Sequence, residues 1–326
     1  MLPKASVELE LRPATLDDSA LAADLDTLRE PQDPRDPVLM RHWWTDFDPR
    51  ERFTRSIMVR DGVAMALVSA GHREWEPGQT RFGWIRPRLH PDIWTEERFA
   101  RIVDRCEQWL REEGGNVSVF RCRDYLPNEL EASKRLGYRE VRRGRISELD
   151  LVGRREAILA TANETRDMMR ERGVELMVFS QYDQPDKTER LYRLETQTEE
   201  DIPTTVPIPV LDLEAWIARR FRDPAVREDR IWLAIEDGEL VGMSQLGYPV
   251  VRGLPHTDYT ATARRVRGRG IARALKYQSM AQALELGFTI VRTMNDAENA
   301  PMLHINREMG YRPAFEEIEL HRELGA

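Results

Sequence analysis

The sequence Arg267-Gly268-Arg269-Gly270-Ile271-Ala272 lies between a predicted strand near 256–263 and a predicted helix over 271–286. Glycines in such a turn let the backbone approach a ligand closely, and the free N–H groups at the start of a helix form an anion site. The basic residues around these glycines form the densest basic cluster of the chain: Arg264, Arg265, Arg267, Arg269 and Arg273. The stretch predicts a pyrophosphate-binding loop, with a tight turn carrying solvated arginines as the alternative.

Two common phosphate motifs do not fit this loop. No Gly-Lys-Ser/Thr follows it, so it is not a Walker loop. Arg273 stands where the third glycine of a dinucleotide fingerprint belongs.

The chain repeats itself with a spacing of about 173 residues. Gly114 and Gly287 end predicted helices (287 − 114 = 173), and Leu-Gly-Tyr-Arg at 136–139 corresponds to Met-Gly-Tyr-Arg at 309–312 (310 − 137 = 173). The Asp-Gly turns at 61–62 and 237–238 differ by 176. Because the same element types surround each match, the repeat predicts a duplication: a first domain over 1–152, a connecting helix over 153–173 and a second domain over 174–326.

The hydrophobic periodicity gives both halves the same order of elements. Helices cover a mixed sheet in each half. The second half is predicted to contain strands near 176–180, 256–263, 289–293 and 315–323, a hairpin around 237–238, and helices near 184–196, 211–222, 271–286 and 301–309. The first half is predicted to contain strands near 7–12, 83–86 and 117–121, closing strands that end at 151, and a hairpin at 61–62. Its helices are predicted after Leu16, over 95–113, and in a short stretch that ends at Gly137.

The second half resembles the GNAT superfamily of N-acetyltransferases. After the glycine loop and its helix come a strand ending in Thr-Met-Asn at 293–295, then Asn299, then a helix closing in Asn-Arg-Glu-Met-Gly-Tyr at 306–311. The coenzyme A signature of that family, Gln/Arg-x-x-Gly-x-Gly/Ala, is satisfied by Arg267, Gly270 and Ala272. The resemblance covers roughly 174–323 and implies the α/β (α+β) class, with tandem GNAT folds whose mixed, mostly antiparallel, twisted sheets are flanked by helices. It also implies acetyl-coenzyme A (acetyl-CoA) as co-substrate.

The resemblance further implies which residues bind the cofactor and which react. The cofactor-binding positions it assigns are Thr260, Ala261, Thr262, Arg267, Gly268, Arg269, Gly270, Ile271, Ala272, Asn295, Asn299 and Asn306. The catalytic candidates are His256 and Asp258 as general base and the backbone N–H of Thr262 as carbonyl polariser. Asn306 stands where many relatives carry a tyrosine that acts as the general acid. An asparagine cannot protonate a thiolate as a phenol can. The other candidates for the general acid are therefore Tyr259, Tyr277 and water.

The first half resembles the same fold but lacks the signature. A shift of 173 places 267–272 on Trp94-Thr95-Glu96-Glu97-Arg98-Phe99, which contains no glycine and carries two carboxylates. Carboxylates repel phosphates, and bulky side chains block the approach of a ligand to the backbone. Thr95 can still cap a helix. The first domain is therefore expected to be a degenerate copy with a structural or substrate-covering role.

Composition restricts the remaining classes of function. The formal charge of −8 argues against a nucleic-acid or membrane-surface binder. The chain lacks an apolar run of about 20 residues, a secretory signal and any metal-ligand spacing, which predicts a cytoplasmic protein without a metal. Its only two cysteines, Cys106 and Cys122, are expected to be buried thiols.

The expected function is transfer of an acetyl group from acetyl-CoA to a primary amine of a small molecule, by direct attack in a ternary complex, in a monomer or homodimer. The acidic stretch Glu199-Glu200-Asp201 either lines the acceptor side for a cationic amine or is a solvated loop. Two other readings are a mycothiol synthase-like acetyltransferase, against which Asn306 counts, and a non-catalytic acyl-CoA-binding sensor.

Overall fold

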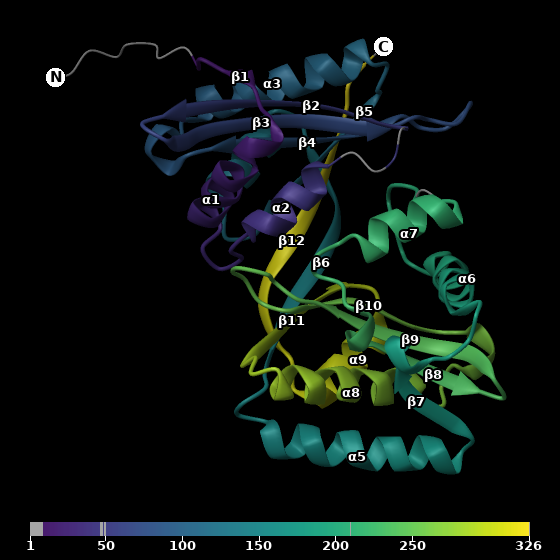
Figure 1. Ribbon diagram of the computed structural model, residues 1–326. Helices are drawn as coiled ribbons and strands as arrows, with labels where there is room; N and C mark the ends of the chain where they lie inside the picture. Colours follow the sequence, from purple (N-terminus) through teal and green to yellow (C-terminus); the bar gives the residue numbers. More distant parts are fainter. Residues whose placement is uncertain (1–8, 46–47, 49, 209, 326) are drawn as a thin grey trace. The chain divides into compact units, whose positions relative to one another are not determined.

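The computed structural model describes residues 9–45, 48, 50–208 and 210–325, which fall into two compact units (Figure 1). The N-terminal unit comprises the described residues up to Arg142 together with 251–253 and those from Glu317 onward. The C-terminal unit comprises 143–250 and 254–316. Each unit is a mixed sheet with helices on both faces, as the sequence predicts.

The sheet of the N-terminal unit is antiparallel except for one parallel pair, β4 with β5. Its strands are, in spatial order, β1 (Arg12–Pro13), β2 (Glu51–Arg60), β3 (Val63–Arg73), β4 (Phe82–Leu89), β5 (Val117–Arg123) and the end of β12 (Arg312–Glu323). One face is covered by α1 (Ser19–Arg29) and α2 (Pro37–Trp44), and the other by α3 (Glu96–Glu112) and α4 (Pro127–Arg135). Separate apolar cores therefore form on the two faces.

The C-terminal unit repeats this plan, again with a single parallel pair, β10 with β11. Its strands are, in spatial order, the end of β6 (Arg139–Asp150), β11 (Ile290–Asp296), β10 (His256–Thr262), β9 (Glu239–Gly247), β8 (Ile231–Glu236) and β7 (Val174–Val178). One face carries α8 (Ile271–Glu285), with α9 (Ala300–Met309) in the same apolar cluster, and the other carries α6 (Lys187–Glu199) and α7 (Leu213–Phe221).

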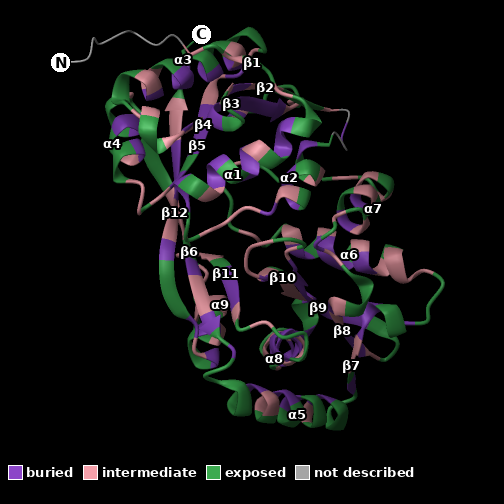
Figure 2. Cartoon of the chain, turned by 60° about the vertical axis from the view of Figure 1, so that its left-hand side comes forward, coloured by how far each residue is buried: buried purple, intermediate pink, exposed green. Residues whose placement is uncertain are grey.

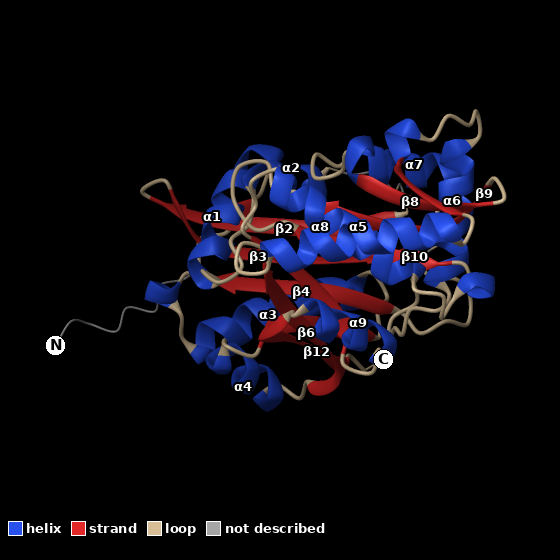
Figure 3. Cartoon of the chain, turned by 90° about the horizontal axis from the view of Figure 1, so that it is seen from below, coloured by secondary structure: helices blue, strands red, loops and turns tan. Residues whose placement is uncertain are grey.

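The helix predicted as a connector is α5 (Arg155–Glu171), and it packs against α8 within the C-terminal unit. Figure 2 shows the largely exposed outer face of α5 and the largely buried α8 inside it. Seen from below, the two helices run together along the strands of this unit (Figure 3). Burial on almost all sides fixes α8, and α8 is the helix that the glycine loop precedes.

The last strand of each half is grouped with the unit formed by the other half. Residues 143–150 of β6 pair with β11, from Gly144↔Asp296 to Asp150↔Ile290. Residues 317–323 of β12 pair with β5, from Glu317↔Arg123 to Glu323↔Val117. The sequence-based domains place 143–152 in the first domain and 317–326 in the second, so they differ from the compact units at these two strands.

The turns that revealed the repeat have matching backbone conformations. Asp61 and Asp237 both have a φ of 51°, and the glycines that follow them have φ values of 78° and 76°. Two successive left-handed residues form the tight turn that joins antiparallel strands, here β2 to β3 and β8 to β9. The repeated Asp-Gly pairs are therefore equivalent hairpins in equivalent sheets.

Both cysteines are free, buried thiols, as predicted. Burial raises the pKa of each thiol to about 12, so neither is a thiolate at neutral pH. Within the described ranges, no helix combines the length and apolar character needed to cross a membrane.

Candidate functional site

The site in the C-terminal unit begins where β10 and β11 separate. The register between these parallel strands contains one pair, His256↔Arg292, whereas β10 stays paired with β9 up to Thr262↔Gly242. The N–H of Ala263 donates to the carbonyl of Val241 at 2.9 Å, which fixes the alternation of the ladder. Hydrogen-bonded and non-bonded pairs alternate in an antiparallel ladder, so the N–H groups of Thr260 and Thr262 point away from β9. They lie along the edge of β10 that faces β11.

Asp258 is the extra residue of a β-bulge in this strand. Thr257 pairs with Leu246 and Tyr259 with Gln245, which leaves Asp258 without a partner position in β9. Bulges bend a strand and re-aim the side chain. The carboxylate of Asp258 accepts a hydrogen bond from Gln245 Nε2 at 2.9 Å and is 42% exposed. It is therefore held by the sheet yet open to solvent.

His256 lies two residues earlier on the same face of the sheet. Its ring covers Gly247 of β9 so closely that a Cβ added at Gly247 would lie 2.7 Å from the ring. The glycine is thus required by the position of the imidazole. The sequence predicted that His256 and Asp258 share a face, and the contacts with Gly247 and Gln245 place them so.

Two helices bring further polar groups to this face, which the sequence analysis missed. Glu195 of α6 pairs with Arg220 of α7 at 2.7 Å and accepts a hydrogen bond from Trp216 Nε1 at 3.1 Å. Burial raises the pKa of Glu195, against the opposing effect of Arg220. Arg220 also lies 3.9 Å from Asp258. The sequence feature that could have indicated this pair is the presence of Glu195 and Arg220 at positions of amphipathic helices that are otherwise buried.

The glycine loop adopts the conformation that its sequence predicts. Gly268 and Gly270 have φ values of 75° and 86°, and Gly270 immediately precedes α8. A Cβ added at Gly268 would meet nothing within 4 Å, and one added at Gly270 would meet Met169 Cε at 3.8 Å. Glycine is therefore required by the left-handed backbone and not by crowding. The first N–H groups of α8, at 271–273, have no partner within the helix. They provide the positive end of the helix dipole at the loop.

The arginines of the loop are paired with carboxylates. Arg264 contacts Asp201 at 2.7 Å, and Arg267 pairs with the same carboxylate, lowering its pKa to about 2. Arg269 contacts Glu236 at 2.6 Å. The acidic segment after α6 was expected to line the acceptor side or to be solvated. The segment is exposed at Glu200, whose side chain is 67% accessible, and Asp201 pairs with two arginines of the loop and orients them.

The three asparagines differ in their surroundings. Asn306 is buried in α9, and its Nδ2 donates to Asn295 Oδ1 of β11 at 2.6 Å. Asn306 Oδ1 is buried and has no hydrogen-bond partner among the described residues. Asn299 caps α9, where its side chain accepts from the N–H of Met302 at 3.3 Å. The structure therefore brings Asn295 and Asn306 together and gives Asn299 a helix-capping contact.

The two tyrosines considered as acids make different contacts. The Tyr259 hydroxyl lies 2.8 Å from Thr198 Oγ1, and burial raises its pKa. The Tyr277 ring lies 5.1 Å from the guanidinium of Arg273.

Lys276 is a buried amine of α8 that the sequence analysis also missed. Its Nζ has no hydrogen-bond partner within the described part of the chain and lies 5.3 Å from the centroid of the Tyr311 ring. Burial lowers the pKa of Lys276 from 10.5 to about 7. The sequence signal was a lysine between apolar helix positions such as Leu275 and Met280.

The described residues contain no group of three or more His, Cys, Asp or Glu side chains arranged to hold a metal ion. In the N-terminal unit, the segment equivalent to the glycine loop is an ordinary helix start. Thr95 Oγ1 accepts from the N–H of Arg98 at 3.2 Å, which confirms the predicted cap, and Glu96 pairs with Arg135 at 2.6 Å.

Comparisons with known proteins agree with this geometry. The sequence profile described as the acetyltransferase (GNAT) family matches residues 188–311. No curated protein matches the sequence. Among solved structures, a tandem GNAT protein from the clavulanic acid biosynthesis pathway is 17% identical, with a TM-score of 0.72 over 98% of this chain and 99% of the other. A GCN5-related N-acetyltransferase from Sphaerobacter thermophilus is 17% identical, with a TM-score of 0.66 over 97% and 96% of the two chains. Both share the fold of this chain over nearly its whole length, and the first is described as a tandem GNAT protein.

Proposed function

We propose that the chain transfers an acetyl group from acetyl-CoA to a primary amine of a small molecule, on the premise that residues 188–311 match the profile of the acetyltransferase (GNAT) family. The observation that carries the proposal is the opening between β10 and β11 that leads into the glycine loop of α8. A strand edge with free N–H groups and a helix N-terminus suit the amides and the pyrophosphate of one extended cofactor.

The equivalent segment of the N-terminal unit, 94–99, contains no glycine, which supports a single cofactor site per chain. Within the C-terminal unit, the N–H groups at 268–272 bind the pyrophosphate in this proposal, with Arg267 and Arg269 beside them. Thr260 and Thr262 bind the pantetheine arm and the thioester carbonyl through their N–H groups. Ala261 alternates with them and points its own N–H toward β9.

Asp258 is the proposed general base. The bulge presents its carboxylate on the face that α6 and α7 cover, beside Gln245 and Arg220. The neutral amine attacks the thioester carbon, the carbon–sulfur bond breaks, and the amine proton passes to Asp258 or to a water bound to it. His256 is the second candidate because it shares this face.

The departing thiolate takes its proton from water in this proposal. Asn306 cannot donate a proton as a phenol does, and its amide is engaged with Asn295. The lack of a proton donor at Asn306 also favours the second candidate function, a non-catalytic acyl-CoA-binding sensor. It counts against a mycothiol synthase-like reaction, whose family carries a tyrosine at this position.

Asp258→Asn is expected to lower kcat about 100-fold, because general-base catalysis of this kind contributes about 10²- to 10⁴-fold. Steady-state release of the coenzyme A thiol, with a panel of primary amines as acceptors, measures the change. The Kd for acetyl-CoA is expected to change less than about twofold, since the carboxylate lies on the other face of the sheet from α8.

Asp229→Asn is the matched control, because the Asp229 side chain is half-exposed and forms a local ion pair with Arg227 at 3.1 Å. An unchanged kcat in Asp258→Asn would transfer the base role to His256, and the same assay on His256→Gln decides this. Acetyl-CoA binding without turnover of any amine would establish the sensor instead.

A further inference from the structure

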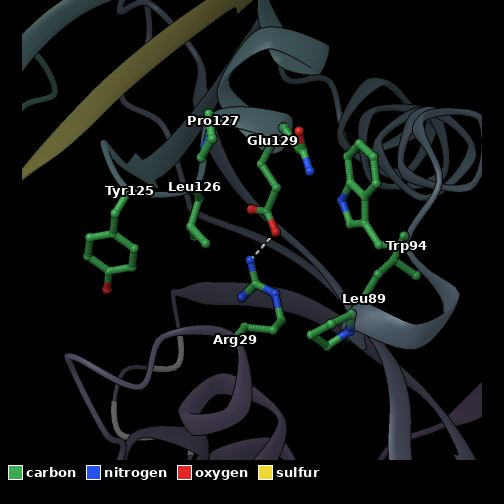
Figure 4. Close-up of a pocket in the computed structure, with 9 residues that line it drawn as sticks. Arg29, Leu89, Trp94, Tyr125, Leu126, Pro127 and Glu129 are labelled. Carbon is green, nitrogen blue, oxygen red and sulfur yellow. Dashed lines mark hydrogen bonds and ion pairs between the residues drawn. The ribbon is translucent and has the colours of Figure 1, made fainter.

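A second candidate site lies wholly within the N-terminal unit. A cavity of about 390 Å³ opens beyond the point where the parallel strands β4 and β5 stop pairing, at Ile85↔Phe120. Three segments line it: the end of β4 and the turn after it, with Leu89, Pro91 and Trp94; 125–129 at the start of α4; and Arg29 at the end of α1. Figure 4 shows Arg29 and Glu129 pointing toward one another, between Trp94 and Leu89 on one side and Tyr125 and Leu126 on the other.

The cavity is the counterpart of the proposed cofactor site, with different chemistry. The shift of 173 relates Leu89 to Thr262, Trp94 to Arg267 and Leu126 to Asn299. Apolar side chains therefore stand where the other unit has polar ones, and Trp94 replaces the arginine of the signature. Ligands commonly bind at the carboxyl ends of diverging parallel strands. Both copies of the fold therefore have an opening between their parallel strands, but the side chains that line the two openings suit different ligands.

Three buried polar atoms at this cavity have no hydrogen-bond partner among the described residues: Arg29 Nε, Glu129 Oε2 and Trp94 Nε1. The side chains of Arg29 and Glu129 are only 2% and 6% exposed and form an ion pair with each other. A buried polar atom that lacks a partner destabilises the protein unless a bound molecule satisfies it. Side chains that line the cavity thus carry two donors and one acceptor without a partner among the described residues.

We propose that this cavity binds a small uncharged amide. Arg29 pairs with Glu129, and the two other carboxylates near Arg29, those of Asp26 and Glu30, are shared with Arg88. The charges beside the cavity are therefore paired, and a ligand with a net charge would find no free counter-charge in the described part of the chain. The N–H of an amide donates to Glu129 Oε2, and its carbonyl accepts from Trp94 Nε1–H or Arg29 Nε–H. The indole of Trp94 and the side chains of Leu89, Leu126 and Pro127 enclose the apolar body of the ligand.

Benzamide, benzoate and benzamidine test the proposal, because they share a shape and differ in charge. Calorimetric titration of the full chain is expected to give saturable binding of benzamide, at least about 10-fold tighter than that of either charged analogue. Trp94→Phe removes one donor and is expected to weaken benzamide binding about 5- to 10-fold. Trp43→Phe, at an exposed position 44% accessible outside the cavity, is expected to leave it unchanged.

Glu129→Gln provides a second variant, with thermal melting to establish that it folds. Trp94→Phe keeps the proposal testable if Glu129→Gln does not fold. The absence of saturable benzamide binding, equal binding of the three analogues, or an unaffected Trp94→Phe would each overturn it. So would competition by acetyl-CoA, which would place benzamide at the glycine loop. None of these outcomes depends on whether the chain transfers acetyl groups.

Discussion

Replacing Gly270 with glutamate is expected to weaken acetyl-CoA binding about 1,000-fold while the protein remains folded. The new carboxylate would stand at the start of α8, among the N–H groups proposed to bind the pyrophosphate. Unit charges about 4 Å apart near a protein surface repel by about 4 kcal/mol, which corresponds to this factor. The positive φ of 86° adds strain of about 1–2 kcal/mol, which lowers stability without unfolding a domain of this size.

Gly287→Glu is the matched control for this strain. Gly287 has a φ of 85° at the other end of α8, and a Cβ there would meet nothing within 4 Å. Both variants are expected to lower the melting temperature by similar amounts, and only Gly270→Glu to lose acetyl-CoA in calorimetric titration. If the two variants bound acetyl-CoA equally well, the loop would be an ordinary turn and the phosphate site would lie elsewhere.

Replacing Lys276 with methionine is expected to raise the free energy of unfolding by about 4 kcal/mol at pH 7. Methionine keeps the unbranched shape of the lysine and removes the buried amine. Lys276 is protonated in the unfolded chain below pH 10.5, whereas the folded chain releases the proton near pH 7. Unfolding therefore takes up a proton between these pH values, and this lysine destabilises the fold less as the pH rises.

Chemical denaturation of both proteins at several pH values measures this effect. The advantage of Lys276→Met is expected to shrink by about 1.4 kcal/mol per pH unit above pH 7, hence by about 3 kcal/mol at pH 9.5. Lys134→Met serves as control, because it makes the same substitution at a side chain that is 44% exposed. A constant difference between wild type and Lys276→Met would show that the folded protein keeps this amine charged.

Most regular elements could be predicted because local signals agree with the tertiary contacts. The periodicity of 271–286 matches α8, and the Asp-Gly pairs mark both hairpins. Helix α2 was not predicted, although Asp36 caps it by accepting from the N–H groups of Val38 and Leu39 at 2.8 and 3.2 Å. Its cap lies among several prolines, which suggest a loop when the sequence is taken alone.

The candidate site divides in the same way. The glycine loop is local, so its sequence predicts its conformation and its place before α8. The bulge at Asp258 depends on the register between β9 and β10, and the pairing of Glu195 with Arg220 depends on how α6 and α7 pack. Neither feature can be predicted from a short stretch of sequence, because both depend on contacts between distant segments. The grouping of β6 and β12 each with the other half's unit could not be predicted for another reason. Both strands begin at the same Gly-Tyr-Arg sequence, so the sequence does not show which sheet each one joins.

We propose that one copy of the duplicated fold binds acetyl-CoA, through the glycine loop before α8. Calorimetric titration of the intact chain with acetyl-CoA, recording stoichiometry as well as affinity, tests it most directly. We expect one site per chain in the wild type and none in Gly270→Glu. Two sites per chain, or one site that survives in Gly270→Glu, would show that acetyl-CoA does not bind at this loop alone.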